Sequence, residues 1–353
     1  MATASESPSL GLIKAFLGPS PAHVELDAEE MEQVDCGSYI RWKIRYSVAP
    51  GERVTAFVCV PKEAETPTAA VFCHHQHAGK FALGKSEVVG LAGDPDQAYA
   101  SELAEQGFIT IAPDAIGFEE RNWSPGRSEN ISWFELSTRL VRGQTLLASC
   151  LHDISVALDY LVSGPEVDFE RIGFIGHSYG GRAALWAAAF DQRIRASVSN
   201  CGCIPYRLSF THDTGLQAEF VVPGFAQYHD VDDVIACFQD SALLISATTD
   251  DKWSRGAQDV FANARHALGD NVELALYDGG HVFTPLMRER AYQFLKQRLS
   301  ARVCDRFVGS EVRPRWSGCR AGARFLPSGR WLLGSAGWRC RRRRACSSAS
   351  RRV

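Results

Sequence analysis

A serine at the centre of the pentapeptide Gly176-His177-Ser178-Tyr179-Gly180 has the surroundings of a catalytic nucleophile. An apolar run precedes this pentapeptide and an alanine-rich, helix-like segment follows it, which is the strand–turn–helix context of a nucleophile elbow. The glycines two positions either side of the serine permit a sharp turn. The start of the following helix offers positive potential to a developing oxyanion. The alternative is a turn in which the glycines have only a structural role.

A serine hydroxyl is a weak nucleophile, so it needs a general base that is itself oriented by an acid. After a nucleophile elbow, the acid and then the histidine are expected further along the chain. His281 follows the apolar run 272–277 and is the expected base, the alternative being a histidine on a surface loop. Asp250 follows the apolar run 243–247 and is the expected acid, with Asp251 as the alternative.

Acyl transfer also needs hydrogen-bond donors for the oxyanion, each of which lowers the barrier by about 2.7–4 kcal/mol. We expect one donor to be the main-chain N–H of Tyr179, directly after the serine, and the other to be that of Gln76, in the polar segment after the apolar run 69–73. Three histidines within residues 74–77 raise the alternative of a metal site. Adjacent side chains of an extended segment point to opposite sides, and no nearby carboxylate or cysteine completes a ligand set. Neither a metal nor a cofactor is therefore expected.

These residues can meet only if the carboxyl ends of several strands share one edge of a sheet. Strand-like segments lie at 40–48, 53–60, 69–73, 108–112, 171–175, 194–198, 242–247 and 272–277, and helix-like segments at 96–106, 134–162, 180–190, 256–268 and 285–299. Repeated strand–helix–strand units indicate right-handed crossovers, and so an α/β fold with a mostly parallel sheet and helices on both faces. The first two strands flank Ala49-Pro50-Gly51-Glu52 and are typical of an antiparallel hairpin.

The composition is that of a soluble globular protein, since 45% of the 353 residues are hydrophobic and 22% are charged. No uninterrupted apolar run approaches the roughly 18 residues of a membrane span, so no membrane association is expected. Fourteen arginines and two acids give residues 302–353 a charge of +12, which leaves −15 for residues 1–301. An acidic body is not expected to bind nucleic acid.

The chain divides into three parts by pattern. Residues 1–35 form an expected N-terminal extension that is partly helical, and residues 36–301 an expected catalytic domain. Residues 302–353 mix arginine, glycine, serine, cysteine and tryptophan without periodicity, which predicts a disordered or weakly ordered basic tail. The alternative for this tail is a basic arm that binds nucleic acid or a membrane.

The eleven cysteines and the first residues of the chain indicate in which cellular compartment the protein is expected. Cys59 and Cys73 lie inside apolar runs, which favours buried free thiols in a reducing compartment. The first ten residues lack the basic start of a secretory signal and include Glu6. We therefore expect a cytoplasmic protein.

The chain resembles the α/β-hydrolases of the dienelactone hydrolase and acetyl-xylan-esterase-like type, which share their catalytic domain with the prolyl oligopeptidases. The resemblance covers about residues 36–300 and is carried by the passages 69–79, 107–117, 139–181, 243–250 and 279–281. It implies an α/β-hydrolase fold with an eight-stranded, mostly parallel sheet and a small cap. It also implies hydrolysis of a small-molecule carboxylic ester through an acyl-enzyme.

Carried over to this chain, the resemblance gives Ser178 as nucleophile, Asp250 as acid and His281 as base, with Gln76 and Tyr179 as oxyanion donors. Two departures stand out. A serine replaces the cysteine nucleophile of dienelactone hydrolases proper, which favours an esterase. A histidine, the residue before Gln76, stands where the family's oxyanion loop usually has glycine.

The substrate pocket is expected near the carboxyl ends of the strands, where open α/β sheets bind ligands. His75, Trp123 and Tyr206 are the residues expected to line it, from the oxyanion loop and from the segments 118–142 and 201–240. The alternative is that the aromatic side chains of these two segments only cover the sheet as a cap. Three other functions stay open: a peptidase of the prolyl-oligopeptidase type, an acyltransferase, and a noncatalytic binding protein of the same fold.

Overall fold

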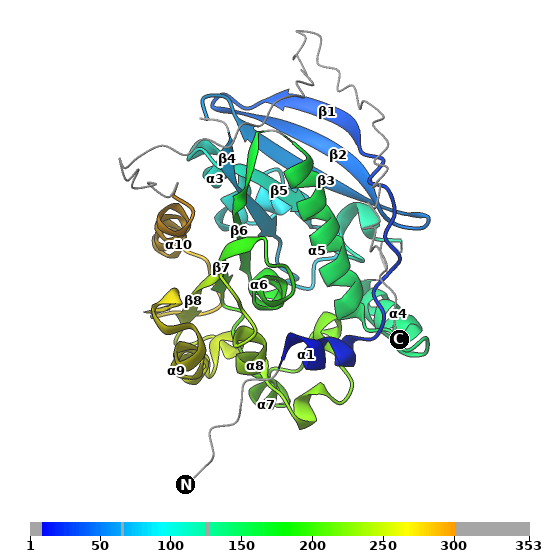
Figure 1. Cartoon of the computed structure of the whole chain (residues 1–353), viewed down its shortest axis with the longest axis vertical. Coiled ribbons are helices and arrows are strands. Elements are labelled where there is room, and N and C mark those ends of the chain that lie inside the picture. The colour runs from blue at the N-terminus through cyan, green and yellow to red at the C-terminus, as the bar shows by residue number, and fades with distance from the viewer. Residues whose placement is uncertain (1–8, 65–66, 124–127, 165, 301–353) are drawn as a thin grey trace, which may run out of the picture. The chain divides into compact units, whose positions relative to one another are not determined.

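A nine-stranded β-sheet organises the chain in the computed structural model, which describes residues 9–64, 67–123, 128–164 and 166–300 (Figure 1). The strands are β1 (Glu29–Asp35), β2 (Tyr39–Ala49), β3 (Glu52–Pro61), β4 (Thr68–His74), β5 (Ile109–Pro113), β6 (Val167–His177), β7 (Ile194–Asn200), β8 (Ala242–Thr248) and β9 (Val272–Tyr277). Their order is β1-β2-β3-β5-β4-β6-β7-β8-β9. The strands β1, β2, β3 and β5 pair with one another in that order, and these three pairs are antiparallel. The remaining pairs, from β5 through β4, β6, β7 and β8 to β9, are parallel.

The sheet has one strand more than the eight expected, and the extra strand lies inside the predicted N-terminal extension. β1 pairs with β2 along an outer edge, and only Val34 of its seven residues is partly buried. Its sequence, EEMEQVD, lacks the alternation of apolar and polar residues by which half-buried strands are recognised. The sheet therefore begins at Glu29, before the expected domain boundary at residue 36.

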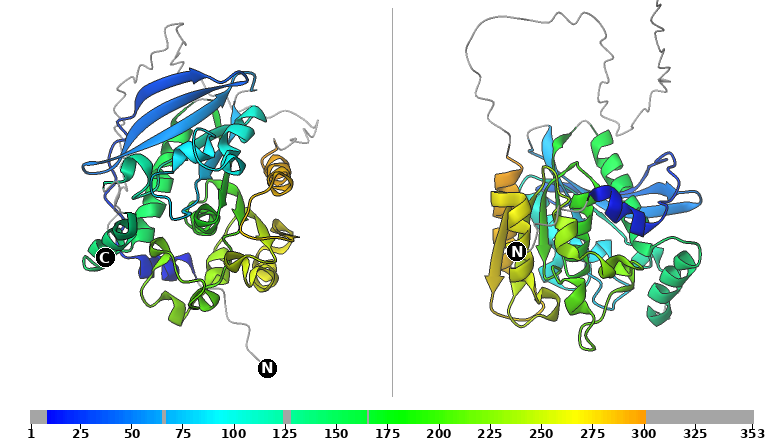
Figure 2. Two further views of the ribbon diagram at one scale, coloured as in Figure 1. Left: turned by 180° about the vertical axis from the view of Figure 1, so that it is seen from behind. Right: turned by 60° about the horizontal axis from the view of Figure 1, so that its bottom comes forward.

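Helices cover both faces of the sheet, as the pattern of crossovers predicted. They are α1 (Leu10–Leu17), α2 (Lys85–Val88), α3 (Tyr99–Glu105), α4 (Ser128–Leu140), α5 (Leu146–Ser163), α6 (Tyr179–Phe190), α7 (Tyr206–Ser209), α8 (Val231–Ile235), α9 (Ala257–Leu268) and α10 (Pro285–Arg298). Figure 1 shows α5 and α6 in front of the sheet, and the view from behind in Figure 2 shows α3 and α10. Alternate strand residues serve the two faces: Phe72 packs with the α5 and α6 side, and its neighbours Val71 and Cys73 pack with the α3 and α10 side.

One long helix was expected over residues 134–162, but the structure has two. α4 ends at Leu140, and Gly143 then takes a left-handed backbone conformation with φ of 72°. Thr145 caps the next helix, because its hydroxyl accepts a hydrogen bond from the N–H of Ala148 at 3.2 Å. The helical periodicity continues across this break, so periodicity alone could not reveal it.

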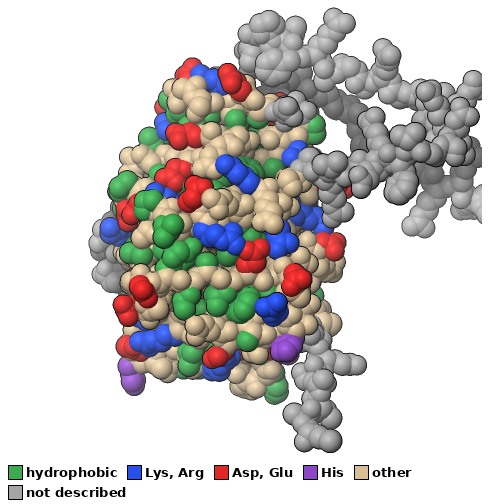
Figure 3. Space-filling view, turned by 90° about the vertical axis from the view of Figure 1, so that its left-hand side faces the viewer, with side chains coloured by type: hydrophobic (Ala, Val, Ile, Leu, Met, Phe, Trp, Pro, Cys, Tyr) green, Lys and Arg blue, Asp and Glu red, His purple; other side chains and the backbone are tan. Residues whose placement is uncertain are grey.

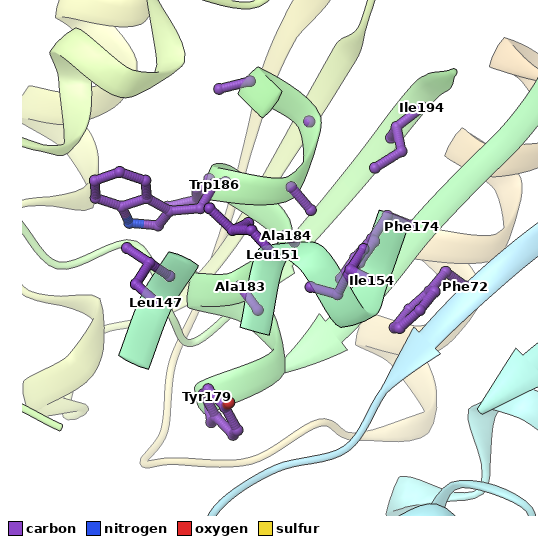
Figure 4. Packing of buried hydrophobic residues seen from close by; sticks show 14 of the residues in the cluster. Phe72, Leu147, Leu151, Ile154, Phe174, Tyr179, Ala183, Ala184, Trp186 and Ile194 are labelled. Carbon is purple, nitrogen blue, oxygen red and sulfur yellow. The ribbon is translucent and has the colours of Figure 1, made fainter. Parts of the chain in front are cut away.

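The core beside the nucleophile turn is built by α5 and α6. Figure 4 shows Leu151 and Ile154 of α5 beside the small side chains of Ala183 and Ala184 of α6, and all four belong to one buried cluster. Alanine lets the helices approach closely, and each fully buried leucine or isoleucine contributes about 1.5–3 kcal/mol. By length and composition α5 is also apolar enough to cross a membrane, but 61% of it is buried inside this core.

The face drawn in Figure 3 carries mixed charges, and most of the described thiols are buried. The described part of the face in Figure 3 has acidic and basic side chains interspersed with apolar ones. The seven cysteines in the described residues form no disulfide with one another, and all but Cys36 are buried. Residues 302–353, for which a disordered basic tail was expected, lie outside the described residues.

Candidate active site

The turn between β6 and α6 places Ser178 in a conformation that only glycine adopts easily. Its φ is 57° and its ψ is −114°, and a non-glycine residue held there costs on the order of 1–3 kcal/mol. The turn is held by the main chain, because the N–H of Ser178 donates to the carbonyl of Asn200 at the end of β7, at 2.8 Å. The geometry is that of a nucleophile elbow, at the serine where the sequence pattern predicted it.

The glycines of the motif let three backbone segments meet at this turn. A Cβ on Gly176 would lie 2.3 Å from the carbonyl carbon of Gly180, across the turn. A Cβ on Gly180 would lie 2.2 Å from the carbonyl oxygen of His74, at the end of β4. The loop after β4 therefore packs directly on the elbow, which is where an oxyanion loop has to be.

A histidine–carboxylate pair lies on the loops that follow β8 and β9. Nδ1 of His281 and Oδ1 of Asp251 are 2.9 Å apart, with the carboxylate buried and the imidazole about one third exposed. The N–H of Trp253 and the hydroxyl of Ser254 also donate to this carboxylate, at 3.1 and 2.7 Å. Burial raises the pKa of Asp251, but the hydrogen bond from His281 and these other donors outweigh burial, so its pKa lies below the usual range.

The prediction that Asp250 is the acid is corrected by this geometry. Asp250 is exposed, and it is its main-chain N–H that has a structural role, donating to the carbonyl of Gly279 at 2.9 Å. Asp251 instead begins a short 3₁₀ turn, Lys252–Ser254, and its carboxylate faces inward. The signal available in the sequence was the pattern Asp251-Lys-Trp-Ser254, in which an aspartate accepts hydrogen bonds from residues two and three positions on.

His177 links the loop that carries His281 to the turn that carries Ser178. The ring of His177 lies 4.6 Å from that of His281, measured between centroids, and Ser178 is the next residue in the chain. The loop carrying His281 is anchored just before the histidine, because the hydroxyl of Thr248 donates to the carbonyl of Gly280 at 2.8 Å. The structure thus gathers the predicted serine and histidine at the carboxyl edge of the sheet, together with Asp251.

The two expected oxyanion donors flank the elbow. Tyr179 is the first residue of α6, where a main-chain N–H has no partner in the helical ladder. Gln76 is half-buried in the loop that packs on Gly180. Burial raises the pKa of the Glu87 carboxyl, and a hydrogen bond from the side chain of Gln76 offsets part of this rise. The main chain of Gln76 is thus the part left to serve an oxyanion.

The prediction that His75 lines a pocket is also corrected. The side chain is fully buried, and burial lowers its pKa to about 3. Its Nδ1–H donates to the carbonyl of Gln76 at 2.8 Å, and its Nε2 accepts from the N–H of Ala115 at 3.1 Å. His75 therefore braces the loop after β4 against the segment after β5, which a residue without a side chain could not do.

The other two residues that were predicted to line the pocket, Tyr206 and Trp123, differ in exposure. Tyr206 is fully buried, and its hydroxyl donates to the carbonyl of Phe220 at 2.9 Å, so this prediction is corrected as well. Trp123 is half exposed, and its indole N–H donates to Glu135 of α4 at 2.7 Å. Burial and hydrogen bonding therefore favour the alternative for Tyr206, a cap residue that covers the sheet.

A buried ammonium lies beneath the segment that follows β5. Nζ of Lys85 contacts Asp114 at 2.7 Å, Glu119 at 2.6 Å and Glu120 at 2.7 Å. Burial lowers the pKa of Lys85, but these carboxylates outweigh it and raise the pKa overall, which keeps the ammonium charged. Sequence reasoning missed this cluster, because Lys85 and the three carboxylates come from two segments that are about 30 residues apart in the chain.

Two groups of side chains among the described residues converge closely enough to hold a metal ion. In the group formed by Asp114, Glu119 and Glu120, the ammonium of Lys85 already occupies the space between the carboxylates. The second group is Cys201 with Asp251 and His281. Burial raises the pKa of the Cys201 thiol to about 12, so it is not a ready thiolate ligand.

Comparison with known proteins links the chain to esterases and related hydrolases. The dienelactone hydrolase family matches residues 85–297. The protein YtaP of Bacillus subtilis (strain 168) is 29% identical over 260 residues, which are 70% of this chain and 84% of that protein. The structure resembles a glucuronoyl esterase from Solibacter usitatus, with 18% identity and a TM-score of 0.60 over 82% of this chain and 91% of that one. It also resembles an acetyl xylan esterase from Paenibacillus sp. R4, with 20% identity and a TM-score of 0.56 over 82% of this chain and 93% of that one. The fold is that of the α/β-hydrolases.

Proposed function

Because the chain belongs to the dienelactone hydrolase family, we propose that this hydrolase is a serine esterase that cleaves a carboxylic ester through an acyl-enzyme. The observation that carries the proposal is the combination at one sheet edge of a strained serine and an imidazole–carboxylate pair. A turn with only a structural role would not need the histidine and the buried carboxylate beside it. The same argument weighs against a noncatalytic binding protein.

In the proposed reaction, the hydroxyl oxygen of Ser178 attacks the ester carbonyl and His281 takes the hydroxyl proton. Asp251 accepts from Nδ1–H of His281, which leaves Nε2 as the basic nitrogen and stabilises the imidazolium. The main-chain N–H groups of Gln76 and Tyr179 bind the oxyanion. The imidazolium then protonates the leaving alcohol. His281 then deprotonates a water molecule, whose oxygen attacks the carbonyl carbon of the acyl-enzyme. The bond to the serine oxygen breaks, the acid leaves, and the imidazolium returns the proton to Ser178.

The proposed substrate is a small acyl ester, and an ester on a carbohydrate is the class that the structural neighbours favour. The neighbours in the comparison are named for acetyl xylan and glucuronoyl esters. Similarity at this level of sequence identity establishes the fold alone, so a carbohydrate ester as substrate is part of the proposal. Serine at position 178, where dienelactone hydrolases proper use cysteine, also favours an esterase over a dienelactone hydrolase in the strict sense.

Hydrolysis of p-nitrophenyl acetate by the wild-type chain and by Ser178→Ala tests the proposal. Ser199→Ala is the matched control, since Ser199 lies on the neighbouring strand β7, is fully buried, and its hydroxyl has no hydrogen-bond partner among the described residues. We expect turnover by the wild type and the control, and loss of at least about 10³-fold in Ser178→Ala. A series of acyl lengths and acetylated sugars then ranks substrates. Turnover that survives in Ser178→Ala would contradict the proposal.

A further inference from the structure

Asn200, the last residue of β7, touches both halves of the candidate site. Its main-chain carbonyl accepts from the N–H of Ser178 at 2.8 Å, and its side chain is fully buried. Nδ2 lies 3.0 Å from the carbonyl oxygen of Val282 and 2.7 Å from Nδ1 of His177. Oδ1 accepts from the hydroxyl of Ser246 at 2.6 Å. All the polar atoms of this amide are therefore engaged.

These contacts determine which atom donates in each hydrogen bond. The carbonyl oxygen of Val282 can only accept, so the atom of Asn200 that faces it is the amide nitrogen. The second N–H of that nitrogen points to Nδ1 of His177, which must therefore be the unprotonated ring nitrogen. The proton of His177 consequently lies on Nε2. Burial, and then the neighbouring His281, lower the pKa of His177 to about 3, so the ring is neutral.

The two N–H groups of the Asn200 side chain bind two groups near His281, the base in the proposed reaction. Val282 is the residue after His281, so the first hydrogen bond holds the main chain one residue beyond His281, in the peptide between Val282 and Phe283. Cys201 assists there, because its thiol approaches the same carbonyl at 3.5 Å. The second hydrogen bond sets the tautomer of His177, whose ring packs on His281 with centroids 4.6 Å apart. A neutral ring can face the imidazolium that forms during catalysis without repelling it.

We propose that Asn200 is a positioning residue, which aligns His281 with Ser178 through the two N–H groups of one amide, one to the Val282 carbonyl and one to His177. The proposal rests on the proposed esterase function. Because the main chain of the same residue holds the N–H of Ser178, nucleophile and base share one anchor. Displacement of the base by about 1 Å is enough to lower a rate about 100-fold.

The first test compares Asn200→Asp and Asn200→Ala with the wild-type chain. Asn200→Asp keeps the size and the oxygen that faces Ser246 but removes both N–H donors, and Asn200→Ala removes the whole amide. We expect kcat for p-nitrophenyl acetate to fall about 10- to 100-fold in both, with KM within about twofold, because alignment and not binding is lost. Ser199→Ala, one residue away on β7, should retain wild-type kcat.

The outcomes separate this proposal from the esterase function. A kcat within about threefold of wild type in folded Asn200→Asp or Asn200→Ala, with an active wild type, overturns the positioning role alone. A wild type that hydrolyses no ester overturns the proposed function and the positioning role with it. A loss that appears in KM rather than kcat also overturns the positioning role.

A measurement on the wild-type chain covers the case in which the variants do not fold. Long-range ¹H–¹⁵N spectra report the tautomer of each histidine, and a His177→Gln variant assigns the signal of His177. We expect the neutral Nε2–H tautomer between about pH 5.5 and 8, as the amide of Asn200 dictates. A proton on Nδ1 of His177 would overturn the network, since this nitrogen could then not accept from Asn200.

Discussion

Two adjacent aspartates follow β8, and only the second reaches the histidine. Asp250 is exposed, whereas the carboxylate of Asp251 is buried and lies 2.9 Å from Nδ1 of His281. The two residues have the same chemistry, so burial and direction alone separate their roles. This makes the pair a sharp test of the site at the scale of single residues.

We predict that Asp251→Asn lowers kcat by about 10³- to 10⁴-fold, because an amide at this position can favour the wrong imidazole tautomer. Asp250→Asn is the matched control and should stay within about threefold of wild type, since only its main chain takes part in the loop. Steady-state hydrolysis of p-nitrophenyl acetate measures both. A reversed order of the two effects would restore Asp250 as the acid.

The residues that sequence analysis could predict are those with a pattern around them. The positions of Ser178 and His281 follow from a glycine motif and from the end of a strand. The sequence alone favours Asp250 over Asp251, because it defines the end of β8 only to within about 2–4 residues. Asn200 and Lys85 have no pattern, because their partners are far away in the chain and meet only in the fold.

At the scale of elements, the elbow depends on close contact between β4 and the start of α6. A Cβ on Gly180 would lie 2.2 Å from the carbonyl oxygen of His74, a backbone atom that cannot move without displacing the oxyanion loop. The turn thus requires glycine for space at a position where the backbone angle alone does not demand it. The contact joins the turn that carries Ser178 to the loop that carries Gln76.

We predict that Gly180→Ala destabilises the chain by about 1–3 kcal/mol and lowers kcat, because the loop after β4 must move away. Gly11→Ala is the control, since a Cβ on Gly11, in α1, would have only the hydroxyl of Ser9 nearby, at 3.8 Å. Alanine there should add about 0.5–1 kcal/mol. Urea unfolding and kcat measure both variants, and a stable, active Gly180→Ala would refute this view of the elbow.

Lys85 joins α2 to the segment after β5, and we predict that Lys85→Met costs about 3–5 kcal/mol of stability. The substitution keeps the bulk of the side chain but leaves the buried carboxylate of Asp114 without its cation. Lys62→Met is the control, because Lys62 pairs with an exposed carboxylate of Asp35, and should change stability by less than about 1 kcal/mol. Equal effects on the urea midpoint would contradict the buried cluster.

The strands and helices themselves were largely predictable, and the exceptions share one cause. β1 has an exposed, acidic sequence without alternation, and the break between α4 and α5 interrupts a helical pattern that continues across it. In both places pairing or capping outweighs the local pattern. β1 forms because β2 offers an edge, and α5 begins because Thr145 caps it.

At the scale of the whole molecule, three buried histidines surround the elbow in neutral form. Burial lowers the pKa of His74 to about 4 and of His75 and His177 to about 3. The unfolded chain takes up a proton at each near pH 6.5, whereas the folded chain does not. Because the folded pKa values are the lower ones, the histidines favour folding above about pH 6.5, and this contribution is lost as the pH falls toward 3.

We therefore predict that the free energy of unfolding falls on acidification from about pH 6.5 to 4, each histidine contributing up to about 1.4 kcal/mol per pH unit. His75→Asn, which keeps a donor and an acceptor but cannot titrate, should reduce the slope by about that amount. His212→Asn, at an exposed position, should leave it unchanged. Urea unfolding at a series of pH values measures the slope, and an unchanged slope in His75→Asn would refute the prediction.

The central claim is that Ser178 is a nucleophile activated by His281, and covalent labelling tests it most directly. The full chain is treated with a fluorophosphonate, digested and analysed by mass spectrometry, in parallel with His281→Gln and Ser199→Ala. We predict one phosphonyl group per chain on the peptide that contains Ser178, formed as fast in Ser199→Ala and at least about 10³-fold more slowly in His281→Gln. An adduct on another residue, or equal labelling in His281→Gln, would contradict the claim.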